Sequence, residues 1–127
     1  MTPMIREITA ELRRADDQSR DWYAWATNQL AHGVVGGAGV ALLMPVLAPP
    51  LAALLVPPLY YIGWERGLQR GRDLVDSLTD TGHVAAGAAL LATAASGGPW
   101  APLVVCLAWA VALRVGVARR IRAEDAR

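Results

Sequence analysis

Residues 22–64 read WYAWATNQLAHGVVGGAGVALLMPVLAPPLAALLVPPLYYIGW, and none of them carries a charge. A second charge-free stretch runs from Thr81 to Leu113. A helix that crosses a bilayer needs about 20 mostly apolar residues, so each stretch is long enough for roughly two crossings. The sequence therefore predicts an all-α polytopic membrane protein with four transmembrane helices, arranged as two helical hairpins.

Proline and glycine clusters near the middle of each stretch predict the hairpin turns, because proline breaks a helix. One cluster is Ala48-Pro49-Pro50 and the other is Ser96-Gly97-Gly98-Pro99. Pro57-Pro58 predicts a kink inside the second helix. We place the four spans at residues 28–47, 51–64, 81–95 and 100–118, within a single membrane domain that comprises residues 1–127.

The charged side chains gather in three blocks, which are residues 1–21, residues 65–80 and the C-terminal end from Arg114. In the first block, apolar side chains recur at helical spacing, which predicts an amphipathic helix on the cytoplasmic or interfacial surface. With four crossings the three blocks share one face of the membrane. Arginine-rich loops favour the cytoplasm. We therefore expect an inner (plasma) membrane protein with both termini and the polar segment 65–80 in the cytoplasm.

Composition excludes several classes of protein. The net charge of +1 provides no strong field for nucleic acid. Cys106 is the only cysteine, so there is neither a disulfide framework nor a CxxC metal site. The absence of lysine, with 12 arginines and abundant alanine and glycine, indicates GC-rich coding and thus a bacterial or phage origin. No GxSxG, HExxH or P-loop motif is present, so the sequence does not favour an enzyme and implies no cofactor.

A polar stripe enters the third predicted span. Asp73, Asp76, Asp80, His83 and Gly87 are spaced three and four apart, so they lie on one face of a helix. Ionisable groups at membrane depth usually face the interior of the bundle, which indicates a polar site. The alternative is an acidic helix start that complements the helix dipole.

The two histidines open similar segments. His32 is followed by Gly36, and His83 by Gly87, which suggests a two-fold repeat of helical hairpins. In such a repeat the histidines can meet inside the bundle and bind a divalent cation or relay protons. The alternative is two interfacial histidines bonded to backbone or lipid phosphate. The candidate polar site comprises His32, Glu65, Arg72, Asp76, Asp80 and His83.

Small residues predict close helix packing. Gly33 and Gly37 form a GxxxG step, which allows another helix to approach closely. The candidate helix-packing residues are Gly33, Gly36, Gly37 and Gly87.

Over about residues 28–95 the chain resembles the VanZ-like family of small polytopic bacterial membrane proteins. Asn28-Gln29-Leu30-Ala31-His32 resembles the family's Asp-Lys-x-x-His motif, although Asn28-Gln29 replaces the Asp-Lys pair. A charged segment also replaces the family's first span. The family is linked to glycopeptide tolerance, and the resemblance implies a polar site between helices. The residues that resemble its second motif are Glu65, Gln69, Gly71-Arg72, Asp76, Asp80, His83 and Gly87, with His83 where the family has asparagine.

These observations favour a small bacterial or phage inner-membrane protein with a cytoplasm-facing His/Asp site between helices, acting on an envelope lipid or a cation. A holin-like pore former that self-associates through its glycine and alanine faces is the first alternative. A structural subunit of a membrane complex is the second. The expected partners are the lipid bilayer and either further copies of the chain or other subunits, with no nucleic acid.

Overall fold

The computed structural model describes residues 4–6, 10, 21–69 and 73–126. These residues form the helices α2 (Trp22–Leu43), α3 (Pro49–Tyr60), α4 (Leu74–Ala95) and α5 (Trp100–Asp125), with a π-helix η1 (Tyr61–Leu68) that continues α3. The all-α prediction is confirmed. Most of the amphipathic helix predicted in residues 1–21 lies outside the described residues, as does Arg72.

Local chemistry explains where the helices begin. The Asp21 carboxylate caps α2 by accepting hydrogen bonds from the backbone N–H groups of Tyr23 and Ala24, at 2.8 and 3.1 Å. Asp73 caps α4 in the same way, through the N–H of Val75. At the start of α3, Pro49 and Pro50 occupy the first helical positions, where a missing N–H costs nothing.

The change from α3 to η1 follows two internal prolines. Pro57 and Pro58 lie inside α3 and cannot donate helical hydrogen bonds. From Tyr61 onward the chain adopts the wider π-helical turn, which ends with a bond from the N–H of Gln69 to the carbonyl of Trp64 at 3.0 Å. This wider turn contains Glu65, a buried carboxylate.

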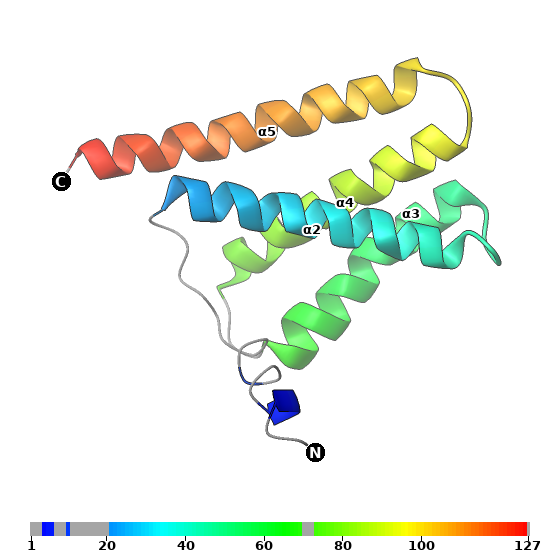
Figure 1. Ribbon diagram of the computed structural model, residues 1–127, viewed down its shortest axis with the longest axis horizontal. Coiled ribbons are helices and arrows are strands. Elements are labelled where there is room, and N and C mark those ends of the chain that lie inside the picture. The colour runs from blue at the N-terminus through cyan, green and yellow to red at the C-terminus, as the bar shows by residue number, and fades with distance from the viewer. Residues whose placement is uncertain (1–3, 7–9, 11–20, 70–72, 127) are drawn as a thin grey trace.

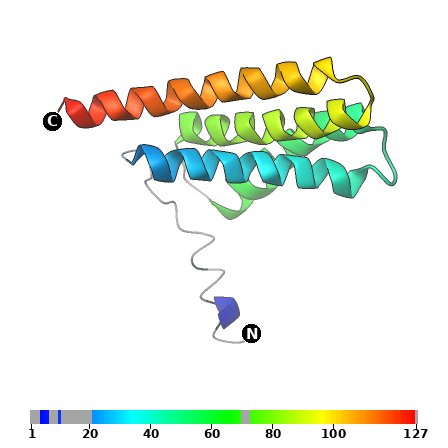
Figure 2. The same ribbon diagram turned by 45° about the horizontal axis from the view of Figure 1, so that its top comes forward.

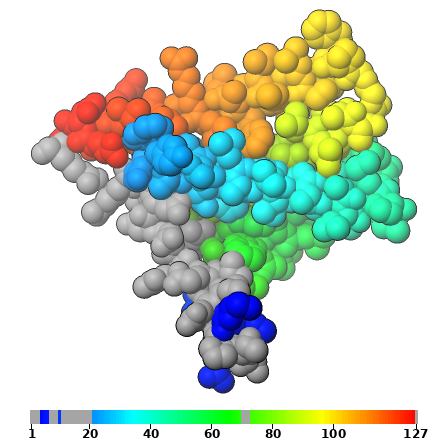
Figure 3. Space-filling model, viewed as in Figure 1, coloured from blue at the N-terminus to red at the C-terminus, as the bar shows by residue number. Residues whose placement is uncertain are grey.

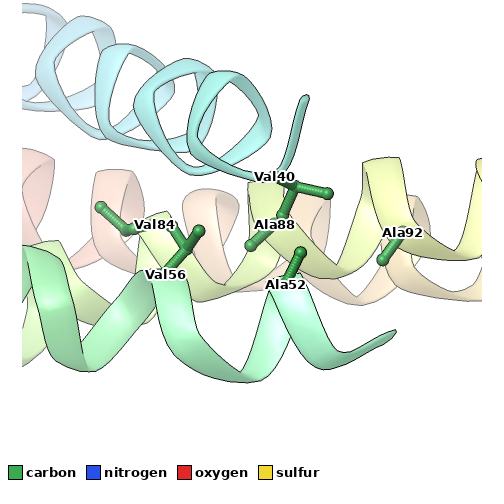
Figure 4. Close-up of a cluster of buried hydrophobic side chains, with 6 residues drawn as sticks. All are labelled: Val40, Ala52, Val56, Val84, Ala88 and Ala92. Atoms are coloured by element: carbon green, nitrogen blue, oxygen red, sulfur yellow. The ribbon is translucent and has the colours of Figure 1, made fainter. Parts of the chain in front are cut away.

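The bundle is organised around α4, which packs against α2, α3 and α5 (Figures 1 and 2). A turn at Gly97 and Gly98, whose φ angles are +87° and +98°, sends α5 back along α4. Those positive angles suit glycine, which lacks a Cβ. A small aliphatic core joins α2, α3 and α4 (Figure 4). Its buried members are Val40, Ala52, Val56, Val84, Ala88 and Ala92.

Glycines allow α2 and α4 to touch backbone to backbone. A Cβ added to Gly36 would overlap the carbonyl oxygen of Val84, and a Cβ on Gly87 would overlap that of Gly33. Gly33 also accommodates the indole ring of Trp109 from α5. A Cβ on Gly37, by contrast, would lie 3.7 Å from the Gly87 oxygen, an ordinary contact distance.

The prediction of four transmembrane helices is wrong. Among the described residues only α5 is both long enough and apolar enough to cross a membrane. The assignment of both termini to the cytoplasm depended on four crossings, so it loses its basis together with that count.

The physical reason is that a stretch without charge is not always an apolar helix of spanning length. Helix α3 has 12 residues, or about 18 Å at 1.5 Å per residue, against a hydrocarbon layer of about 30 Å, and its continuation η1 carries the charged residues Glu65 and Arg66. Asn28, Gln29 and His32 make α2 more polar than the absence of charge suggests. Helix α4 begins before Thr81 and therefore includes the carboxylates of Asp76 and Asp80.

The outer surface is rich in exposed apolar side chains. Helix α5 has 26 residues and none of them is buried. Large hydrophobic side chains are also exposed on α2 and α3, for example Val34, Leu42 and Leu54 at 71–79% of their full area. An apolar surface of this extent indicates an interaction with a membrane or with another protein.

Candidate functional site

Polar side chains gather inside the bundle, where α2, η1 and α4 meet. The buried polar residues are Gln29, Glu65, Ser77, Asp80 and His83. Burying a polar side chain costs free energy unless the side chain is hydrogen-bonded. A buried polar cluster therefore indicates a specific network of hydrogen bonds.

Asp80 lies at the centre of this cluster and is completely buried. Its Oδ1 accepts a hydrogen bond of 2.8 Å from the side-chain amide of Gln29 on α2. Its Oδ2 lies 3.7 Å from Nε2 of His32, one turn further along α2. Asp80 therefore connects α4 to two polar side chains on α2.

Glu65 brings a second buried carboxylate to the cluster from η1. Its two oxygens accept hydrogen bonds from the hydroxyl of Tyr60, at 2.7 Å, and from the hydroxyl of Ser77, at 2.8 Å. Tyr60 also packs edge-on against His32, with ring centroids 5.7 Å apart. The π-helical turn thus directs a carboxylate toward the histidine of α2.

His32, Glu65 and Asp80 form a set of potential metal ligands. Each offers one ligand atom, and these three atoms lie within 4.8 Å of one another. Two further buried atoms in this region, the amide oxygen of Gln29 and Nδ1 of His32, have no hydrogen-bond partner among the described residues. An imidazole with two carboxylates is a donor set that suits a divalent transition-metal ion.

His83 lies between this cluster and α5. Its Nδ1 accepts a hydrogen bond of 2.7 Å from the indole N–H of Trp109, so that nitrogen carries no proton. Trp25 packs edge-on against the same ring, with centroids 5.8 Å apart. Burial lowers the pKa of His83, as does the nearby His32, while the charge of Asp80 acts in the opposite direction.

Trp25 also contacts α5 at Arg120, whose guanidinium lies 3.9 Å from the centre of its indole ring. The carboxylate of Asp76 lies close enough to act electrostatically on Arg120. Asp76 therefore belongs to the contact between α4 and α5, whereas Asp80, one turn later, faces α2.

The structure thus brings together four of the predicted site residues, His32, Glu65, Asp80 and His83. It places Asp76 apart from them. Gln29, Tyr60 and Ser77, which contact the carboxylates of Asp80 and Glu65, were not among the predicted site residues, and neither was Trp109, the partner of His83. The position of Ser77, one turn before Asp80, was a usable signal, but the bonds of Tyr60 and Trp109 depend on tertiary packing.

Comparison with known proteins yields no match to a family model, a curated protein or a solved structure. The resemblance to the VanZ-like family therefore stays a prediction.

Proposed function

We propose that this chain is a small membrane-associated protein that binds a divalent cation between α2, η1 and α4. The observation that carries the proposal is the proximity of His32, Glu65 and Asp80, whose ligand atoms lie within 4.8 Å of one another in the interior. An imidazole nitrogen and two carboxylate oxygens are donors that a divalent zinc ion takes in proteins.

The surroundings of the three residues support the same proposal. Tyr60 and Ser77 hold the carboxylate of Glu65, and Gln29 holds that of Asp80. Such outer contacts orient the ligands of metal sites and strengthen binding. Three protein ligands leave a coordination position open for water or another molecule, as in zinc sites that act on substrates.

Membrane association is proposed through α5, the helix that is long and apolar enough to cross a bilayer. The inner membrane of a bacterium remains the proposed location. Arg114, Arg119 and Arg122 near the C-terminal end of α5 favour the cytoplasm for that end.

Two observations weigh against the holin-like alternative. Its self-association would use glycine faces, yet the tightest glycine contacts, at Gly36 and Gly87, lie inside the molecule between α2 and α4. A pore former also has no need of a buried imidazole with two carboxylates. The proposed bilayer contact is shared by both alternatives and does not distinguish them.

The test is a titration of the full chain in detergent micelles with Zn²⁺ after removal of metal by a chelator. We expect one zinc site. Loss of an outer contact lowers metal affinity by about 10–100-fold, and Asp80→Asn should lower the zinc affinity by more than this. The substituted asparagine can still accept the bond from Gln29, so the helix contact is preserved. His32→Ala should have a similar effect.

Asp73→Asn is the matched control, since it makes the same change on the same helix at an exposed cap, where asparagine also caps well. Zinc affinity should not change in this variant. The proposal is wrong if the Asp80→Asn variant binds zinc as tightly as the unchanged chain while circular dichroism shows that the variant is folded.

A further inference from the structure

The side chain of Gln29 brings an additional buried oxygen to the cation cluster. Its side-chain nitrogen donates the hydrogen bond of 2.8 Å to Oδ1 of Asp80. A carboxylate only accepts hydrogen bonds, so this bond fixes which end of the amide is the nitrogen. The oxygen at the other end, Oε1, is buried and has no hydrogen-bond partner among the described residues. Burying an acceptor without a partner costs free energy, which indicates that a donor or a cation binds there.

This oxygen lies near the carboxylate of Asp80. The nitrogen and the oxygen of one amide are about 2.2 Å apart, given standard bond lengths and angles. Because the hydrogen bond measures 2.8 Å, Oε1 of Gln29 lies no more than about 5 Å from Oδ1 of Asp80. The ligand atoms of His32, Glu65 and Asp80 lie within 4.8 Å of one another. Oε1 is therefore within reach of an ion bound by these three residues.

The position of Gln29 leaves its oxygen facing the interior. The side chain is completely buried, and from the side drawn in Figure 3, α2 and α5 cover most of α4. The other unpartnered atom in this region, Nδ1 of His32, is less suited to the ion, because the same ring directs Nε2 toward Asp80 at 3.7 Å. The two nitrogens of one imidazole point in different directions and do not bind the same ion. Oε1 of Gln29 is thus the available donor.

We propose that Oε1 of Gln29 is a fourth ligand of the cation bound by His32, Glu65 and Asp80. The inference rests on the proposed cation site and assigns the position that its three ligands leave open. One imidazole nitrogen with three carboxylate and carbonyl oxygens is a donor set that suits Mn²⁺ as well as zinc. In this arrangement one buried amide uses both of its ends, the nitrogen on Asp80 and the oxygen on the ion.

Electron–nuclear double resonance on bound Mn²⁺ tests this ligand in the full chain. The protein carries glutamine labelled with ¹³C at the side-chain amide carbon, and it is measured in detergent micelles with one equivalent of Mn²⁺. We expect a ¹³C coupling that corresponds to about 3 Å, the separation that a bond to the carbonyl oxygen imposes. The same spectrum should show the ¹⁴N coupling of one imidazole, which reports the cation site itself and should disappear in His32→Ala.

Variants assign the ¹³C signal to one residue. The chain has three glutamines, Gln18, Gln29 and Gln69, and the amide oxygen of Gln69 is also buried. The double variant Gln18→Asn/Gln69→Asn leaves Gln29 as the single labelled residue and should keep the coupling. Gln29→Leu should abolish the coupling and lower the Mn²⁺ affinity at least about tenfold, the least that loss of even an outer contact costs. Asn28→Leu is the matched control on α2, since its amide lies about 100° around the helix, and it should change neither.

The outcomes separate this inference from the proposed function. An imidazole coupling without a ¹³C coupling, or a ¹³C coupling that persists in Gln29→Leu, overturns the fourth ligand and leaves the cation site in place. A distance above about 4 Å would mean that water bridges Gln29 and the ion, and it would also overturn the inference. Binding of Zn²⁺ without binding of Mn²⁺ would contradict the oxygen-rich donor set alone. If neither ion binds, both proposals are wrong.

Discussion

At the scale of single residues, the cluster depends on which side chain bonds to which oxygen. Asp80 and Glu65 are buried carboxylates, and each accepts a hydrogen bond from a neutral side chain, Gln29 for the first and Ser77 for the second. These hydrogen bonds fix the orientation of both carboxylates, as outer contacts do in metal sites. The proposed cation site depends on this orientation.

His83 should make stability depend on pH. Burial lowers the pKa of His83 from its ordinary value of about 6.5. At pH values between the lowered and the ordinary pKa, the folded chain therefore binds fewer protons than the unfolded chain. The free energy of unfolding therefore reaches its full value above about pH 6.5 and falls on acidification. We expect the metal-free protein to unfold at lower temperature at pH 5.5 than at pH 7.5.

His83→Gln isolates the contribution of His83 to the pH dependence of stability, because glutamine does not titrate but can still accept a hydrogen bond from Trp109. The difference in unfolding temperature between the two pH values should shrink in this variant. A difference equal to that of the unchanged chain would show that His83 is not the group responsible.

At the scale of elements, the closest contact in the fold is the crossing of α2 and α4. Gly36→Ala and Gly87→Ala each force a methyl group into a backbone carbonyl of the other helix. Overpacking of this kind costs about 1–3 kcal/mol, which should appear as a lower free energy of unfolding in denaturant titrations.

Gly37→Ala is the matched control for these two changes. Its added Cβ would meet only the Gly87 oxygen, at 3.7 Å, and alanine is favoured over glycine in a helix by up to about 1 kcal/mol. This variant should be as stable as the unchanged chain or more so. Equal destabilisation by all three substitutions would contradict the observed crossing.

The helical elements could be predicted from the sequence because the turn signals are local. The turns at Pro49-Pro50 and at Gly97-Gly98 act within a few residues of their own position. The π-helical turn was not predicted, although Pro57-Pro58 pointed to an irregularity. The turn places Glu65 where it accepts a hydrogen bond from Ser77 on another helix, and local sequence does not encode such a tertiary contact.

Sequence reasoning also located part of the site, and for a physical reason. Asp80 and His83 share a helical face, so their common direction follows from periodicity alone. Their partners on other helices follow from packing, which is why Tyr60 and Trp109 were missed. The count of spans was wrong because absence of charge was taken as a measure of apolarity, while Gln29 and His32 are polar without being charged.

At the scale of the whole molecule, the described helices bury a polar cluster beside a small aliphatic core and expose many large apolar side chains. Buried Gln29, Glu65 and Asp80 contrast with α5, in which no residue is buried. The length and apolar composition of α5, together with its lack of buried residues, are the basis of the proposed membrane association.

Arginines placed in the middle of α5 test that association. Leu107→Arg combined with Val111→Arg puts two charges on its exposed face, each costing about 2.5–3.5 kcal/mol at the centre of a bilayer. We expect the double variant to leave the membrane fraction on carbonate extraction of cells. The Ile121→Arg variant, whose new charge lies at the charged end of the same helix, should remain in the membrane fraction. Full retention of the double variant in membranes would argue against α5 as the membrane anchor.

We propose that the cluster formed by His32, Glu65 and Asp80 coordinates a metal ion. X-ray absorption at the zinc edge, measured on the full chain loaded with one equivalent of Zn²⁺, identifies the ligands of the bound ion. We expect a shell of nitrogen and oxygen ligands at about 2.0–2.2 Å, with the outer-shell signal of one imidazole that disappears in His32→Ala. A spectrum without imidazole, or with a sulfur ligand from Cys106 at about 2.3 Å, would contradict it.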